Sequence, residues 1–205
     1  MVNFIDNDSP LGRFVQRLLE LIGLNLVWVL CCLPVVTAGA ATTALHFGLR
    51  PQPDAEEGAL SRFFRSFRRE FKTATALWLV LLVAAVFLLI CFRIVSFWGG
   101  WLRTAGIMFF CVPALLWLMT AAYAFPLLAR FEIPAWKLAE NALLLALAHF
   151  PRTLAVIALN LMPLVLVWLL PSRVLSILFI LVPVGFSGTA LLIDRCLRPV
   201  FQPLS

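Results

Sequence analysis

Residues 30–50 read LCCLPVVTAGAATTALHFGLR, and this stretch decides how the first apolar segment of the chain is folded. It belongs to residues 21–49, which contain no Asp, Glu, Lys or Arg. As one helix these 29 residues would be about 43 Å long, whereas the hydrocarbon core of a bilayer is about 30 Å thick. A single span would therefore need a large tilt, and it would place the N-terminus outside.

A secretory signal peptide is a second interpretation of the same stretch. Arg13 and Arg17, the apolar run after them and the AGA triplet at 38–40 fit its outline. Glu20 and the many later apolar segments count against cleavage.

A helical hairpin is the third interpretation, and it is the one we favour. Proline lacks the N–H that a continuing helix needs, so Pro34 would end the first helix, with the break between Pro34 and Gly39. Thr37 would be the N-cap of a return helix over 35–50, whose sixteen residues rise about 24 Å. The small residues of this helix would let it approach its neighbours closely, where lipid supplies no hydrophobic drive.

The composition of the whole chain places it in a membrane. Of its 205 residues 63% are hydrophobic and 13% are charged, and the mean hydropathy is +1.02. Soluble domains contain about 45–50% apolar and about 25% charged residues. Four further charge-free runs, at 73–92, 104–129, 153–172 and 174–193, each contain at least 20 residues, which is long enough to span a bilayer.

We therefore predict an all-α fold, a single polytopic membrane helical bundle over residues 1–205. Five long apolar segments, the first broken into a hairpin, would give about six membrane helices. The runs do not alternate between apolar and polar residues, which excludes the strands of a membrane barrel. The 5 cysteines lie in or beside these runs, and their spacing matches neither a disulfide framework nor a zinc site.

Residues 51–72 form the longest polar stretch, an acidic turn followed by a basic amphipathic helix. In LSRFFRSFRREFK, residues 60–72, the leucine and the phenylalanines recur at helical spacing. The opposite face carries the basic residues Arg62, Arg65, Arg69 and Lys72, with Arg68 beside them. We expect this helix to lie at the interface against anionic headgroups before the chain turns into the bilayer. Docking to a partner protein is the alternative use of the same residues.

The distribution of Lys and Arg predicts the topology. The connection 50–72 holds six of them, the connection 130–152 three and the tail two, against three on the opposite side. These connections and the C-terminus are therefore expected in the cytoplasm, and the hairpin adds the N-terminus with Arg13 and Arg17. The connection 131–152 should contain a short helix that does not cross, because only residues 141–150 are free of charge and proline.

No motif in the sequence indicates enzyme chemistry. There is no G-x-S-x-G, no H-E-x-x-H and no Gly-rich phosphate loop. No acid lies near the middle of an apolar run, so a proton- or sodium-coupled carrier would lack its usual carboxylate. We expect no catalytic residue, no metal and no cofactor. We also expect no nucleic acid partner, because the basic residues sit mainly at the ends of apolar runs.

A few polar residues inside the apolar runs are candidates for an intramembrane site: Asn25, Thr42, Thr43, His46 and Asn160. The simpler interpretation of both asparagines is a hydrogen bond between helices. His46 is more simply an interface residue than a ligand.

Several stretches resemble the YesL-like family, a bacterial integral membrane family of unknown function. The resemblance is carried by DNDSPLGRF (6–14), LNLVWVLCCLPVVTAGAATTAL (24–45), RFFRSFRREFKTATALW (62–78) and FPLLARFEIPAWKLAENALLLALAHFPRT (125–153). In the family the second helix usually continues further toward the acidic turn, whereas here Pro51 and Pro53 cut it short.

The resemblance implies a bacterial cell membrane protein of a family often encoded beside carbohydrate ABC transporters, with no established catalytic residue to carry over. The expected function is that of a non-enzymatic accessory component, with ABC permease subunits and anionic lipid as partners. The alternative is a small-solute channel or carrier formed by the bundle itself. Homo-oligomerisation is left open.

Overall fold

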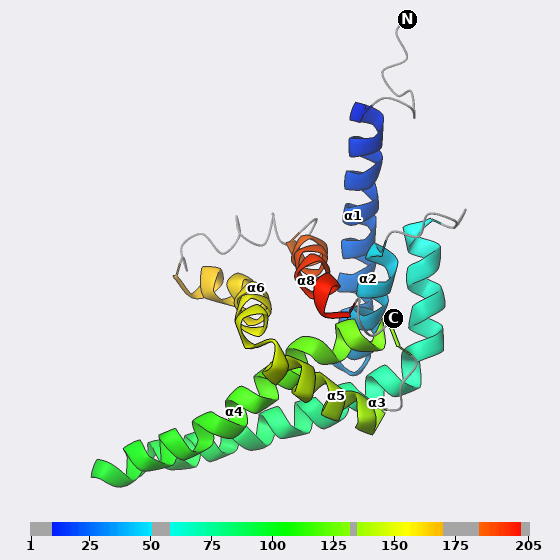
Figure 1. Cartoon of the computed structure of the whole chain (residues 1–205). Coiled ribbons are helices and arrows are strands. Elements are labelled where there is room, and N and C mark those ends of the chain that lie inside the picture. The colour runs from blue at the N-terminus through cyan, green and yellow to red at the C-terminus, as the bar shows by residue number, and fades with distance from the viewer. Residues whose placement is uncertain (1–9, 51–57, 132–134, 170–184, 202–205) are drawn as a thin grey trace, which may run out of the picture.

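A computed structural model describes residues 10–50, 58–131, 135–169 and 185–201 (Figure 1). These residues are helical almost throughout, with no strand among them, as the sequence predicted. The elements are α1 (Pro10–Cys32), the short 3₁₀ turn η1 (Val35–Thr37), α2 (Ala38–Leu49), α3 (Ala59–Ser96), α4 (Gly100–Leu128), α5 (Ala135–Ala148), α6 (Phe150–Leu169) and α8 (Phe186–Phe201).

The predicted break after the first helix is present. Helix α1 ends at Cys32, and Pro34, with φ −76° and ψ 108°, is extended and precedes η1. Thr37 occupies the N-cap position of α2, but its side chain makes no capping bond. Its hydroxyl instead lies 2.5 Å from the carbonyl oxygen of Cys31 and 2.8 Å from that of Pro34. The carbonyl of Cys31 is one of those that the end of α1 leaves without a helical partner, and the Thr37 hydroxyl supplies a donor for it.

Helix α2 packs closely against its neighbours, as its small residues predicted. Ala40, Ala41 and Ala44 are fully buried. A Cβ on Gly39 would lie 2.5 Å from Trp78 Cβ and 2.7 Å from the carbonyl oxygen of Ala74, both on α3. Only glycine allows the two backbones to approach this closely. The arm Val35–Leu49 is nevertheless shorter than a full span of about 20 residues.

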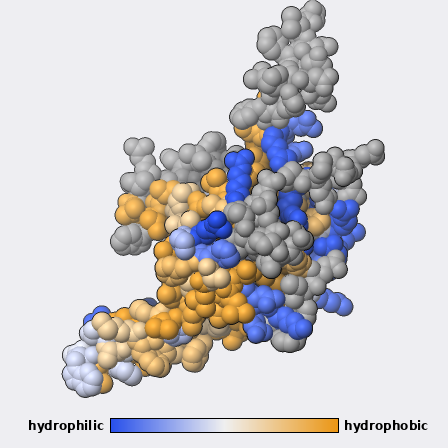
Figure 2. Space-filling view, viewed as in Figure 1, coloured by the Kyte–Doolittle hydropathy of each residue, from blue (hydrophilic) through white to orange (hydrophobic). Residues whose placement is uncertain are grey.

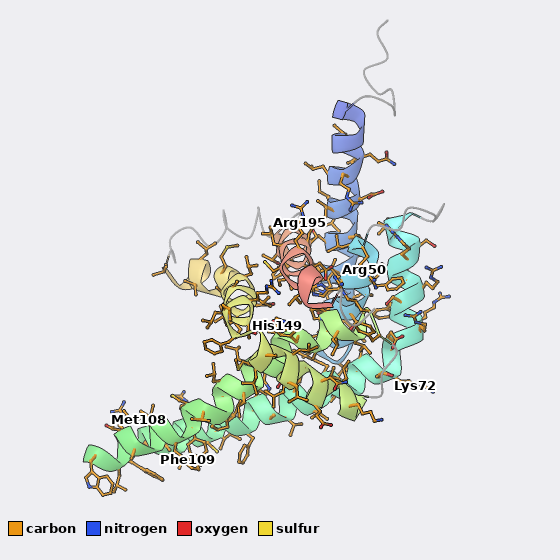
Figure 3. The ribbon with its side chains drawn as sticks, in the orientation of Figure 1. Arg50, Lys72, Met108, Phe109, His149 and Arg195 are labelled. Carbon is orange, nitrogen blue, oxygen red and sulfur yellow. The ribbon has the colours of Figure 1, made fainter. Side chains whose placement is uncertain are left out.

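Helix α3 joins the predicted interfacial helix to the predicted span without a break. It runs over 38 residues, Ala59–Ser96, and the described backbone stays helical throughout. Figure 3 shows the helix changing direction near Lys72, which is where the expected turn into the bilayer falls. The change of direction is therefore a bend within one continuous helix.

The second half of α3 and helix α4 form a hairpin that extends away from the other helices (Figure 1). We call this hairpin, residues 73–128, the α3–α4 arm. Its surface is mostly hydrophobic, and hydrophilic residues gather at the other end of the molecule (Figure 2). Phe97, Trp98 and Trp101 are exposed at its tip, and Arg93 and Arg103 flank them in the sequence. Aromatic and basic residues of this kind are typical of a membrane interface.

Helices α5 and α6 meet at a sharp corner, where their axes are bent by 111°. His149, labelled in Figure 3, lies between them, and Pro151 falls in the first turn of α6, where a missing N–H has no consequence. Thr153 is fully buried and its hydroxyl lies 2.7 Å from the carbonyl oxygen of Ala146 and 3.1 Å from Tyr123 Oη. These bonds connect the corner to α4. Helix α5 is the predicted short helix of the 131–152 connection.

Three described helices, α1, α3 and α4, are long and apolar enough to cross a membrane, and the bent pair would make a fourth if counted as one span. The predicted segment 174–193 lies mostly outside the described residues, as do the N-terminal residues 1–9 and the acidic turn at 51–57. Its last residues belong to α8, which continues to Phe201 and carries Asp194 and Arg195 within the helix.

Candidate functional site

Asn25 joins α1 to the start of α8. Its side chain is fully buried, and its Oδ1 accepts a hydrogen bond of 2.7 Å from the backbone N–H of Ser187. The first N–H groups of a helix have no partner within that helix. Asn25 therefore caps α8 from another helix, and the predicted hydrogen bond between helices is observed.

The other candidate intramembrane polar residues bond mainly within their own helices. The hydroxyl of Thr42 donates to Ala38 and that of Thr43 to Gly39, each four residues earlier. The amide of Asn160 donates to Val156 in the same way, at 2.9 Å. Asn160 is exposed on α6, whereas Asn25 and Thr43 are fully buried. Asn160 therefore lies on the surface of the described residues, apart from the buried Asn25 and Thr43.

His46 faces an acid that the sequence did not single out. Its side chain is buried on α2, and Nδ1 lies 3.4 Å from Oδ1 of Asp194 on α8. Arg130, just after α4, places Nη2 3.8 Å from the same oxygen. Asp194 on α8 therefore contacts α2 through His46 and the residue that follows α4 through Arg130.

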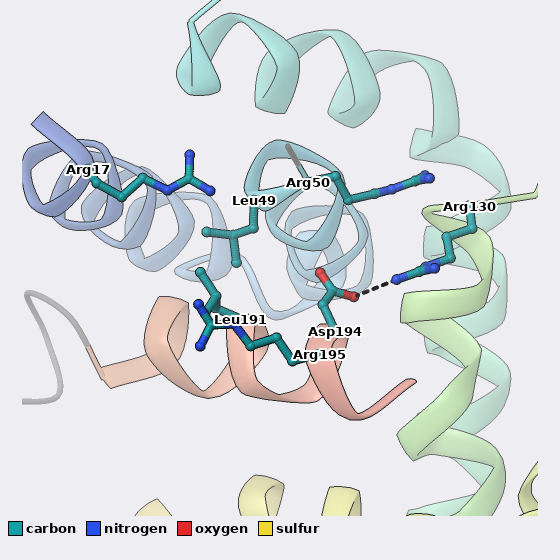
Figure 4. Close-up of a pocket in the computed structure, with 7 residues that line it drawn as sticks. All are labelled: Arg17, Leu49, Arg50, Arg130, Leu191, Asp194 and Arg195. Atoms are coloured by element: carbon teal, nitrogen blue, oxygen red, sulfur yellow. Dashed lines mark ion pairs between the residues drawn. The ribbon is translucent and has the colours of Figure 1, made fainter. Parts of the chain in front are cut away.

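A cavity of about 350 Å³ opens beside this carboxylate. We call it the arginine pocket, and Figure 4 shows its lining: Arg17, Leu49, Arg50, Arg130, Leu191, Asp194 and Arg195. Arg17 also pairs with Glu20 at 3.3 Å. Arg50 donates through Nη1 to the carbonyl oxygen of Ala129 at 3.3 Å, which holds the end of α2 near the end of α4.

The first half of α3 presents most of its basic residues outward. Arg65, Arg68, Arg69 and Lys72 are exposed, and the first three line a surface hollow with Ser61 and Phe64. The guanidinium groups of Arg65 and Arg69 lie 5.9 and 5.4 Å from the centre of the Phe47 ring on α2. These cation–π contacts connect the outward face of α3 to α2.

Arg62 differs from the rest of the predicted basic face because it is buried, with 6% of its surface exposed. Its Nη1 donates to the carbonyl oxygen of Arg50 at 2.7 Å, at the end of α2. Arg62 therefore contacts the protein interior and not a headgroup. Leu60, Phe64 and Phe71, expected on the apolar side, are exposed instead.

The buried face of α3 is rotated relative to the apolar face expected from the sequence. It contains Phe63, Ser66 and Glu70 together with Arg62. Glu70 is buried, and its Oε1 accepts a hydrogen bond of 2.8 Å from Nε of Arg69. Glu70 and Asp194 are thus inward-facing acids that the hydropathy pattern did not reveal, because both lie at the ends of apolar runs in the sequence.

No group of three or more His, Cys, Asp or Glu that could hold a metal ion occurs among the described residues. The chemistry within reach of the arginine pocket is ion pairing and hydrogen-bond donation.

Residues 21–92 match a family described as "Protein of unknown function, DUF624". No curated protein and no solved structure matches the chain. The matched region covers the end of α1, the break at Pro34, helix α2 and α3 as far as Phe92. It includes Arg50 and the exposed basic face of α3, but not the other charged residues of the arginine pocket.

Proposed function

We propose that this protein is a non-enzymatic accessory protein of a bacterial cell membrane that works with a carbohydrate ABC transporter, with both termini in the cytoplasm. The proposal is supported by the resemblance of the sequence to the YesL-like family, whose members are often encoded beside such transporters. The family match over residues 21–92 is to a group without assigned activity, and it is compatible with this function.

The outward face of the first half of α3 is the observation that carries the proposal. Arg65, Arg68 and Arg69 surround a hollow beside Phe64, and all four side chains are exposed. Guanidinium groups beside an exposed aromatic ring suit contact with anionic headgroups and with acidic residues of a permease subunit. We propose this face as the docking surface for the transporter at the membrane.

The hydrogen bonding of the interior favours an accessory role over a solute channel. Asn25 caps α8, Thr42 and Thr43 bond to carbonyls of α2, and Asn160 is exposed on α6. A pathway for a polar solute needs polar groups that face a shared water-filled space. Among the candidate residues, Asn25 joins two helices, and both threonines and Asn160 bond to carbonyls of their own helices.

The docking face can be tested in cells that import a sugar through a carbohydrate ABC transporter. We expect deletion of the protein to lower the rate of sugar uptake. The triple variant Arg65→Gln/Arg68→Gln/Arg69→Gln should lower it to the same extent, with normal amounts of protein in the membrane. Arg152→Gln, which neutralises an exposed arginine on α6, is the matched control and should retain full uptake.

Purified protein in liposomes distinguishes the accessory function from a channel. We expect no sugar flux through the protein alone. Flux through the protein alone, together with unchanged uptake in the triple variant, would contradict the accessory function and support transport by the bundle itself.

A further inference from the structure

The arginine pocket brings together charges from distant parts of the chain. Arg17 lies on α1, Arg50 follows α2, Arg130 follows α4 and Arg195 lies on α8. In the view of Figure 4, the side chains of Arg17 and Arg195 extend to one side of Asp194, and those of Arg50 and Arg130 to the other. Leu49 and Leu191 form an apolar part of the wall between them.

The lining of the pocket has more positive than negative charge. Four arginines and one aspartate line it, so its formal charge is +4 − 1 = +3. Glu20, which pairs with Arg17, lowers the local sum to +2. Like charges around one cavity repel each other, and the repulsion is weakly screened where the surroundings are apolar. An anion in the cavity would remove this repulsion.

We propose that the arginine pocket binds a phosphomonoester, a site separate from the docking face of α3 and independent of the proposed accessory function. A phosphomonoester carries about −1.5 to −2 charges near pH 7, which balances the local excess. Guanidinium groups bind phosphate oxygens through paired N–H donors, and this geometry makes arginine the preferred residue for such groups.

The size of the cavity limits the ligand. Its volume of about 350 Å³ is near the lower end of ligand pockets, which range from about 300 to 1,000 Å³. It suits a phosphate on a short polyol better than a large nucleotide. The same chemistry occurs in soluble phosphorylated metabolites and in the headgroup of an anionic lipid, and the pocket lies beside the ends of α2 and α4.

Two probes distinguish these sources with the purified full-length protein. Glycerol 3-phosphate represents the soluble ligand, and its binding is measured by titration calorimetry with glycerol as the uncharged control. Phosphatidic acid in phosphatidylcholine nanodiscs represents the lipid, and bound lipid is counted by native mass spectrometry. Binding of glycerol 3-phosphate alone indicates a metabolite, binding of phosphatidic acid alone indicates a headgroup, and binding of both indicates a site that accepts either.

The double variant Arg17→Gln/Arg195→Gln tests the pocket directly. Both side chains lie at the exposed side of the cavity, so the fold should tolerate their neutralisation. We expect at least about tenfold weaker binding of whichever probe binds, since hydrogen bonds to charged groups are the stronger ones. Arg152→Gln should bind as the natural protein does. Equal affinity of the double variant and the control, or no binding of either probe at millimolar concentration, would overturn the proposal.

Asp194→Asn provides a second test with the opposite sign. Removing this charge raises the formal charge of the lining from +3 to +4, so phosphate should bind more tightly in protein that retains its thermal unfolding temperature. Should this variant unfold, Glu20→Gln gives the same comparison at a partly exposed side chain, because it raises the local charge from +2 to +3 and frees Arg17 from its pair. Unchanged or weaker binding in a folded Asp194→Asn protein would argue against a phosphate bound by charge.

Discussion

The α3–α4 arm and the junction of α1, α2 and α8 are both apolar in sequence, yet they bury their side chains very differently. In the most apolar windows of α3 and α4 only 11% and 6% of the residues are buried, and in that of α1 also 11%, so the close packing of the junction lies mainly on α2. At the junction Leu24, Ala41, Ala44 and Leu45 are all buried, together with the polar side chain of Asn25. Beyond its base, where residues such as Leu77 and Tyr123 are buried in the core, the arm has few protein neighbours, and the junction has many.

This difference in burial shows that the two regions need different surroundings. Val83, Phe87 and Phe109 are each more than half exposed on the arm, and Figure 3 shows Phe109 with Met108 on its outer surface. Apolar side chains exposed over two long helices are stable in lipid and not in water. The junction instead depends on close contact between backbones and on particular hydrogen bonds, so it should respond to small changes in shape.

The largest effect is expected from a charge in the arm. Val83, 68% exposed, lies near the middle of the apolar half of α3, and Val83→Arg should disfavour insertion by about 2.5–3.5 kcal/mol. The measurement is the fraction of protein that resists extraction from membranes by alkali. Phe97→Arg, at the exposed tip of the arm, should insert normally, because a charge is tolerated at the interface. Equal insertion of the two variants would mean that the arm does not face lipid.

The next effect concerns the close contact between α2 and α3. In Gly39→Ala the new methyl group would overlap Trp78 and the backbone of Ala74, and the expected loss of stability is about 1–3 kcal/mol. Thermal unfolding in detergent measures the change. Gly188→Ala is the control, since a Cβ there meets no atom within 4 Å and alanine favours the helix by about 0.5–1 kcal/mol. A Gly39→Ala protein as stable as the control would contradict the observed packing.

The smallest effect separates the two asparagines. Asn25→Ala removes the group that caps α8 and should destabilise the protein by about 0.5–2 kcal/mol. Asn160→Ala removes only a bond within α6 from an exposed side chain, and it should change stability by less than about 0.5 kcal/mol. Unfolding of both variants in the same detergent gives the comparison. Equal losses would show that the junction is no more sensitive than the outer surface of α6.

Part of the fold could be predicted from the sequence because the deciding forces are local. Proline lacks the N–H that a helix needs, and the break after Cys32 falls at Pro34 as this predicts, although α4 continues through Pro113 and Pro126. Long charge-free runs prefer lipid whatever lies beside them, so the apolar spans of α3 and α4 follow from hydropathy. The small residues of α2 predicted close packing, although they did not show which helix it contacts.

The candidate site depended on partners that the sequence pattern does not specify. In the sequence Asn25 and Asn160 are both single asparagines inside apolar runs. Only the fold brings the backbone N–H of Ser187, 162 positions away, to Asn25. Helical periodicity placed Arg62 on the exposed basic face, but the end of α2 covers it and supplies the carbonyl that it binds.

By itself, therefore, the sequence determined the membrane class, the helical segments and the break at Pro34, because each depends on neighbouring residues and on the solvent around them. Only the tertiary structure decided which charges are buried and that Arg17, Arg50, Arg130 and Arg195 surround one cavity. Burial and charge clustering arise from contacts between residues far apart in the chain, and hydropathy, which describes each stretch alone, carries no information about them.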